Sequence, residues 1–180
     1  MATFIMIPQT QSGTNQWSAS TGTDFVDIVD EDDDSTYIYE TRSGQRISYT
    51  MTNPSVIEAD IDFNEDVTVT PKVMAHHTGT GTANLEFDIT GVGIGYTANQ
   101  VSVSNDSSFP TYSFTSTTEK TSGTDWDYAG LIACNARLTC ATNLARFRQL
   151  QVSYIWIRVD YTAPTVTTIT HNAPFFGTNF

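Results

Sequence analysis

The chain has 180 residues, 39% hydrophobic and 12% aromatic, and its 20 acidic and 8 basic residues give a formal net charge of −12. This length suits one domain with a sizeable core, and the aromatic share argues against intrinsic disorder. The acidic balance repels phosphate groups, which argues against nucleic acid and anionic membranes as partners. Two cysteines are too few for a disulfide scaffold or a four-ligand zinc site.

The first third of the chain predicts short strands separated by polar turns. Alternating or β-branched runs predict strands at residues 2–7, 24–30, 35–39, 45–51 and 56–63. The run at 56–63 has the clearest period of two. The opening segment lacks a basic start and a long apolar centre, so we expect no signal peptide and synthesis in a cytoplasm.

The middle of the chain has the clearest hairpin pattern. Residues 67–76 and 85–89 alternate on either side of a Gly-rich segment at 77–82, which is typical of two strands joined by a flexible tip. Pro71 lies inside the first run, so part of that strand should lie at an edge or a bulge. Shorter strands are expected near residues 101–103 and 112–114.

The last third predicts one helix and the longest strand. A capping sequence at residues 124–127 predicts a short helix over 128–133. Residues 149–161 contain neither Gly nor Pro and are dense in β-branched and aromatic side chains, which predicts a long central strand. A final edge strand is expected at 166–170. Together these elements predict an all-β, antiparallel two-sheet sandwich, jelly-roll-like, with residues 1–173 as one domain.

The acidic run at residues 30–34 is the most conspicuous charged cluster. Asp30, Asp32 and Asp34 have the alternate spacing that opens a calcium-binding loop. The glycine and the bidentate glutamate of that loop are missing, because Ser35 and Thr41 occupy their positions. A solvated acidic turn and a non-standard calcium site are both compatible with this pattern, and no other cofactor is indicated.

Catalytic signals are weak. None of the three histidines lies in a nucleophile, zinc or phosphate motif, and no pair of carboxylates stands out for acid–base chemistry. The sequence therefore predicts a protein that is not an enzyme.

Both ends of the chain carry apolar side chains suited to assembly. Residues 174–180 form an aromatic C-terminal tail beyond the last clear strand, and exposed aromatics on a chain end are costly unless they are covered. We expect interface contacts from the two ends, at Phe4, Ile7, Phe175, Phe176 and Phe180. Either the tail folds back on its own domain or it docks on a neighbouring subunit.

Two stretches resemble a known group of proteins. The segment Asp30 to Ile38, and the later segment from Trp126 to Leu131 followed by Arg148 to Tyr161, are similar to β-sandwich virion proteins of tailed bacteriophages. The resemblance implies a capsid decoration, fibre or tail component on the virion surface. It implies that the partners are other copies of the chain and other virion proteins, such as the major capsid protein, and it implies no catalytic residue.

Two functions from different classes follow. The leading hypothesis is a non-enzymatic virion structural protein that assembles through its sandwich and chain ends, forming a homo-oligomer. The alternative is a carbohydrate-binding module for a host or surface glycan, because jelly-roll sandwiches often bind sugars on exposed aromatic rings. Trp17 is the favoured glycan-binding residue among several aromatic side chains in loops and strand edges.

Overall fold

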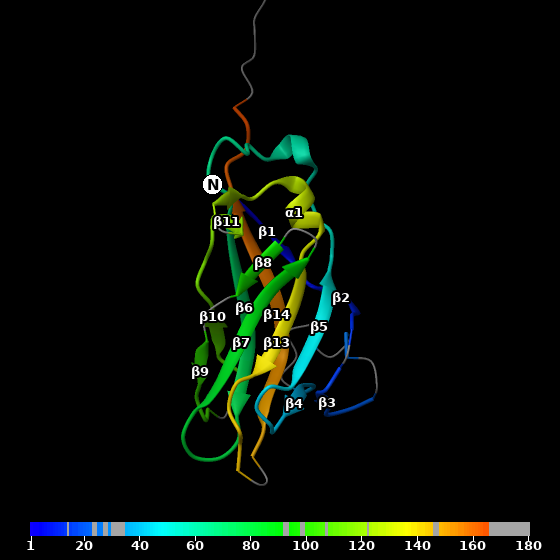
Figure 1. Cartoon of the computed structure of the whole chain (residues 1–180), viewed down its shortest axis with the longest axis vertical. Helices are drawn as coiled ribbons and strands as arrows, with labels where there is room; N and C mark the ends of the chain where they lie inside the picture. The colour runs from blue at the N-terminus through cyan, green and yellow to red at the C-terminus, as the bar shows by residue number, and fades with distance from the viewer. Residues whose placement is uncertain are drawn as a thin grey trace, which may run out of the picture.

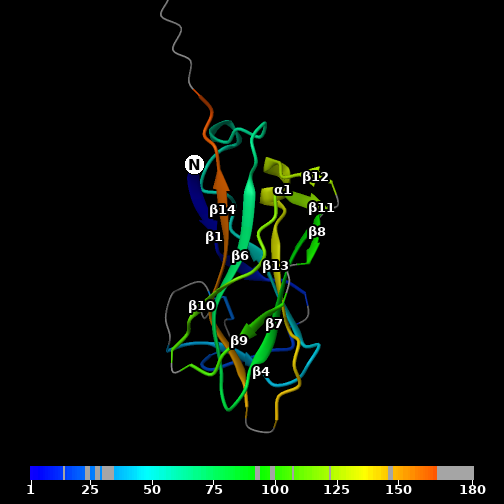
Figure 2. The same ribbon diagram turned by 90° about the vertical axis from the view of Figure 1, so that its left-hand side faces the viewer.

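The computed structural model describes residues 1–13, 15–22, 25–26, 29, 35–91, 94–97, 100–106, 108–121, 123–145 and 148–165. Two six-stranded antiparallel sheets pack face to face in an elongated sandwich (Figures 1 and 2). The predicted all-β sandwich with one short helix is confirmed. Within the described residues, no helix is long and apolar enough to cross a membrane.

Sheet A contains β14 at its centre, and sheet B contains β13 at its centre. The strands of sheet A are β1 (Ala2–Met6), β3 (Ser18–Ala19), β4 (Ile38–Glu40), β6 (Thr68–His77), β10 (Thr111–Ser113) and β14 (Leu150–Tyr161). The strands of sheet B are β2 (Pro8–Gln11), β5 (Arg46–Met51), β7 (Ala83–Gly91), β8 (Ile94–Thr97), β9 (Val101–Val103) and β13 (Asn135–Cys140). The strands β11 (Glu119–Thr121) and β12 (Thr124–Asp125) form a separate two-stranded sheet.

The long strand predicted at residues 149–161 is confirmed as β14. It pairs with β6 along nearly its whole length on one side, and with β4 and then β1 on the other. The ladder with β6 shifts register between Val152 and Tyr154, so β14 contains a β-bulge at Ser153. The extra residue changes the parity of the strand, and Val152 consequently shares the core with Ile155 instead of lying on the opposite face.

The hairpin predicted for residues 67–89 is wrong. β6 pairs with β14 and β10 in sheet A, whereas β7 pairs with β13, β8 and β9 in sheet B. The segment between them therefore crosses from one sheet to the other. Alternation and a Gly-rich turn are compatible with either connection, because both place one face of each strand in the core.

Pro71 occupies a position that its missing N–H allows. β10 pairs only with residues 72–74 of β6, and the carbonyl of Pro71 accepts from the N–H of Phe114, beyond the end of β10. The proline thus lies where the neighbouring strand has already ended, as the sequence predicts.

The strand predicted at residues 56–63 is also wrong. This segment contains a short 3-10 helix, Glu58–Asp60, in which the N–H of Ile57 bonds to the side chain of Asp60. Only Ile61 of its apolar residues is fully buried, and Ile57 is 64% exposed. Local side-chain hydrogen bonding by Asp competes here with the strand that the alternation favours.

The predicted helix is confirmed as α1 (Tyr128–Ile132). The side chain of Asp127 accepts from the N–H of Gly130 and caps the helix N-terminus. A hydrogen bond from Lys120 is the main reason that the pKa of Asp127 lies below its usual value. Of the predicted strand at 24–30, Phe25, Val26 and Val29 are not in a strand and the other residues lie outside the described ones; so does the whole of 166–170.

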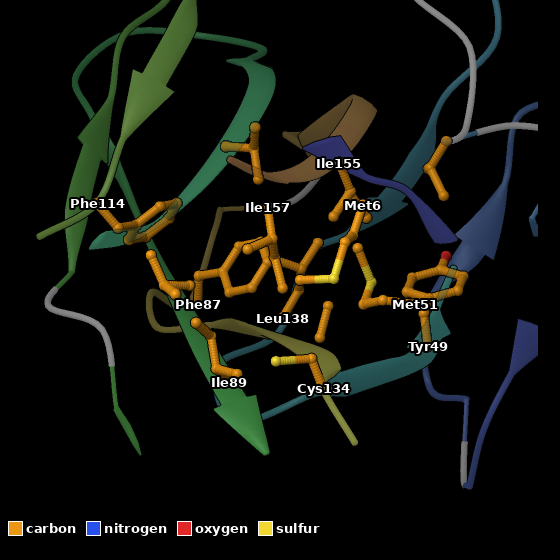
Figure 3. Packing of buried hydrophobic residues seen from close by; sticks show 14 of the residues in the cluster. Met6, Tyr49, Met51, Phe87, Ile89, Phe114, Cys134, Leu138, Ile155 and Ile157 are labelled. Atoms are coloured by element: carbon orange, nitrogen blue, oxygen red, sulfur yellow. The ribbon is translucent and has the colours of Figure 1, made fainter. Parts of the chain in front are cut away.

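The core fills the space between the two sheets (Figure 3). Side chains from β14 in sheet A meet those from β7 and β13 in sheet B, and the ring centroids of Phe87 and Phe114 lie 5.4 Å apart. Each large side chain that becomes fully buried contributes about 1.5–3 kcal/mol to folding. The largest completely buried side chains include Met6, Ile47, Tyr49, Leu85, Phe87, Ile89, Leu138, Ile155 and Ile157.

Candidate functional site: an aromatic face on sheet A

The outer face of sheet A carries a pair of stacked aromatic rings. Beyond the bulge, Ile155 and Ile157 point into the core, so Tyr154 and Trp156 point away from it, and both are half-buried. Their ring centroids are 4.6 Å apart and their planes differ by 24°. Cross-strand neighbours on β6 are Met74 beside Tyr154 and Lys72 beside Trp156.

A second aromatic group lies toward the other end of the same face. Tyr39 of β4 and His76 of β6 lie on either side of Gln151 of β14. The ring of Tyr37 is 6.2 Å from that of Tyr39 and 6.0 Å from that of Phe109, and Phe109 in turn lies 4.8 Å from the ring of His76. We call the surface formed by Tyr37, Tyr39, His76, Tyr154 and Trp156, together with the buried ring of Phe109, the aromatic face.

Hydrogen bonds hold the imidazole of His76 in place. One ring nitrogen bonds to the carbonyl oxygen of Asp106 at 2.9 Å, and the other bonds to the side-chain amide of Gln151. Gln151 continues the chain to the amide of Gln149 at 2.7 Å. Linked polar groups of this kind restrict the rotamers around the aromatic rings, which pre-organises the surface before any ligand binds.

Charged groups flank the stacked pair. The guanidinium of Arg158 donates to Oδ1 of Asp160 through Nε at 3.0 Å and through Nη2 at 2.8 Å. Burial alone would raise the pKa of Asp160, but hydrogen bonds from Arg158 and Thr3, with the charges of Arg158 and Lys72, bring that pKa below its usual value. Asp160 therefore remains ionised beside two cations, although the chain as a whole is strongly acidic.

Two further hollows lie away from the aromatic face. A groove of about 300 Å³ is lined by Val56, Ala59, Asp60, Tyr161, Ala163 and Pro164. A smaller polar cavity of about 40 Å³ is lined by residues 63–67, Thr118, Asp125 and Trp126. The smaller one has room for about three water molecules, because a single water needs roughly 10–15 Å³.

The structure places the predicted site residues differently from the sequence expectation. Trp17 is buried, and its indole N–H donates to the carbonyl of Gln45 at 3.1 Å, so the ring belongs to the core instead of a sugar-binding surface. Phe4 is also in the core, where its ring packs 5.7 Å from that of Tyr161. Ile7 is half-buried, and its backbone pairs with Thr52.

The remaining predicted site residues lie outside the described ones. These are Asp30, Asp32 and Asp34 of the calcium hypothesis and Phe175, Phe176 and Phe180 of the tail. Among the residues that the structure describes, no group of three or more potential metal-binding side chains comes together. The calcium site and the tail contacts stay predictions.

Sequence reasoning did not identify the stacked pair as a site. The alternation in β14 placed Tyr154 and Trp156 on one face, which pointed to packing as readily as to exposure. The signal that identifies them is the switch, within the same face, from aromatic residues to Arg158 and Asp160. Side chains on one face of a strand point to the same side of the sheet. Because this face ends in charged residues, the aromatic residues before them face solvent as well.

Comparisons with known proteins show no family match. No family model and no curated protein matches this sequence. Among solved structures, the chain is similar to the CBM36-1 domain of a multidomain xylanase from the hindgut metagenome of Trinervitermes trinervoides, with a TM-score of 0.46 and 9% identity over 89% of this chain and 98% of that one.

Two other similar structures are also carbohydrate-binding modules. One is a CBM36 module in complex with calcium and xylotriose, with a TM-score of 0.43 and 12% identity over 89% of this chain and 100% of that one. The other is the CBM22-1 xylan-binding domain of Xyn10C from Paenibacillus barcinonensis, with a TM-score of 0.43 and 14% identity over 88% of this chain and 94% of that one. At these scores the likeness supports no argument about ligands, and the resemblance to virion proteins stays a prediction.

Proposed function

We propose that this protein is a non-enzymatic carbohydrate-binding protein that binds glycans on the aromatic face of sheet A. The observation that carries the proposal is the stacked, half-exposed pair Tyr154 and Trp156 on the solvent side of the central strand. This was the alternative reading of the sequence, and the proposal rests on Tyr154 and Trp156 instead of Trp17.

The chemistry of the surface suits a sugar ring. The C–H faces of a pyranose pack on aromatic rings, while its hydroxyl groups need donors and acceptors at the edge of the contact. Trp156 and Tyr154 supply the apolar area, and Lys72 and Arg158 supply polar groups within the same surface. Exposed aromatic side chains that group together on one face of a soluble protein are typical of a binding surface.

The test is binding to a panel of soluble polysaccharides by affinity electrophoresis, followed by calorimetry with oligosaccharides of the best ligand. We expect Trp156→Ala to weaken affinity about tenfold or more, corresponding to about 1.4 kcal/mol, because one stacking surface is removed. Tyr154→Ala should weaken binding in the same direction.

The control is Tyr128→Ala on α1. Tyr128 is also a half-buried aromatic residue, and its hydroxyl donates to the carbonyl of Val56 at 3.0 Å, so its loss should lower stability without changing affinity. A panel with no binding, or equal losses in Tyr128→Ala and Trp156→Ala, would contradict the proposal.

A structural role in a bacteriophage particle is the second proposed function. Besides the sequence resemblance, one edge of β1 has no strand partner among the described residues, and an edge strand that pairs with another chain is suited to assembly. In this role the protein would lie on the virion surface and contact other virion proteins. Co-sedimentation with particles that lack it would test this, and absence of binding to such particles would contradict it.

A further inference from the structure

The strand β1 has one edge without a strand partner among the described residues. Its five residues pair with β14, from Ala2 opposite Tyr161 to Met6 opposite Ile157. No hydrogen bond joins its opposite edge to any other residue that the structure describes until Ile7, which bonds to Thr52. Figure 2 shows β1 at the margin of sheet A. The edge therefore presents backbone donors and acceptors that a further strand would satisfy.

The β1 edge lacks the features that usually prevent strand addition. The sequence Ala-Thr-Phe-Ile-Met has no charged residue, no proline and no bulge, and it is rich in strand-forming side chains. Ile5 points to the outer face and is 49% exposed, while Phe4 and Met6 anchor the strand in the core. Pairing with β14 and the buried side chains hold this strand in place, and no strand that the structure describes covers its other edge.

The other outer strands of the described sheets are shorter or blocked. β2 begins with Pro8 and has an irregular register with β5. β3 has two residues, and β10 has three and directly follows Pro110. β8 has four residues and β9 has three. Short length, proline or irregular pairing thus limits strand addition at these edges. Among the described strands, β1 is the outer strand without such a feature, so we take its edge as the one suited to a partner.

We propose that β1 pairs with β1 of a second copy of this chain, antiparallel about a two-fold axis, and joins the two A sheets into one continuous sheet. A free strand edge is chemically complementary to another strand edge, and a two-fold axis lets the same five residues serve both sides. The pairing also covers part of Ile5. Because β1 carries no charge, the approach avoids direct like-charge contacts in spite of the charge of −12 on each chain.

The dimer has a consequence for the aromatic face, although the proposal does not rest on glycan binding. A two-fold axis perpendicular to the sheet leaves the outer faces of both copies on the same side. Trp156 of each copy would then face the same polymeric ligand, and two linked sites bind a polymer more tightly than either site alone.

The test is the solution mass of the full-length chain by light scattering over about 5–500 µM, with hydrogen exchange at the lowest and highest concentrations. We expect a rise from the chain mass of 19.8 kDa to twice that value, with added protection confined to amides of β1. Ile5→Glu should abolish the rise, because the two carboxylates would lie on the same face as diagonal neighbours across the two-fold axis, where like charges repel. In its own sheet the new carboxylate lies opposite Arg158, so the monomer should still fold.

The matched control is Ile132→Glu, which adds the same charge at an isoleucine of similar exposure, 45%, at the end of α1. This variant should dimerise like the parent chain. A chain that stays monomeric throughout the range overturns the proposal, and so does a dimer that persists in Ile5→Glu or is lost in both variants. If Ile5→Glu fails to fold by circular dichroism, concentration-dependent protection of β1 in the parent chain decides, and its absence overturns the proposal.

Discussion

Two buried carboxylates on this protein have arginine partners but depend on them differently. Oε1 of Glu40 accepts from the backbone N–H groups of Thr41 and Arg42 at 2.7 and 3.0 Å, so its hydrogen bonds do not require the guanidinium of Arg42. In Asp88, Oδ2 instead accepts from Nη2 and Nε of Arg137, at 2.6 and 2.8 Å. Its other oxygen, Oδ1, is buried without a hydrogen bond.

We therefore predict different costs for the same substitution at the two arginines. Arg137→Met should lower the free energy of unfolding by about 2–4 kcal/mol, because it leaves a buried carboxylate without its main partner. Arg42→Met should cost less than about 1 kcal/mol, since the Arg42 side chain is 69% exposed and Glu40 keeps its backbone donors. Urea denaturation of both variants measures the difference, and equal losses would contradict this reading of Asp88.

At the scale of elements, β14 shows how one residue sets a register. The bulge at Ser153 places Leu150 and Val152 in the core together with Ile155, although regular alternation would put Val152 and Ile155 on opposite faces. The hydroxyl of Ser153 is itself buried without a hydrogen bond. The bulge accommodates the extra residue, so the apolar side chains before and after Ser153 all reach the core.

We expect Ser153→Ala to be neutral or stabilising by up to about 1 kcal/mol, because it removes a buried hydroxyl that has no partner. Deleting Ser153 should also keep Leu150, Val152 and Ile155 in the core, since Val152 and Ile155 are then two positions apart and the ladder with β6 becomes continuous, so we expect a loss of no more than about 1–2 kcal/mol. Thermal melts of the two variants provide the comparison. A deletion variant that fails to fold would contradict this reading and show that the bend introduced by the bulge is itself required.

The same strand shows what the sequence could predict. Period-two alternation identified β5 and β14, and the capping sequence identified α1, because these signals are local. The partner of β6 could not be predicted, since pairing depends on residues far apart in the sequence and the Gly-rich segment fits an inter-sheet crossing as well as a hairpin. Trp17 illustrates the same limit. An aromatic residue in a polar loop gives no local sign that it will be buried and that its indole N–H will bond to the carbonyl of Gln45.

At the scale of the whole molecule, the sandwich is closed around a core that contains both cysteines. Cys134 and Cys140 are free and buried, and each thiol donates to a carbonyl, of Gly130 and Thr142 respectively. Burial raises the pKa of Cys134 to about 12 and also raises the pKa of Cys140. Both thiols lie at the two ends of one six-residue strand region, roughly 20 Å apart at 3.3 Å per residue, too far for a disulfide within one chain.

Thiol labelling should therefore report the opening of the whole sandwich. Because the reactive species is the thiolate, both cysteines should resist an aromatic disulfide reagent at pH 8 in the native state and react fully in denaturant. The two single-cysteine variants, Cys134→Ala and Cys140→Ala, should be labelled at the same rate, and that rate should follow global unfolding as urea is added. Fast native labelling of Cys140 alone would show that its end of β13 opens independently, and the two sheets would then not unfold as one unit.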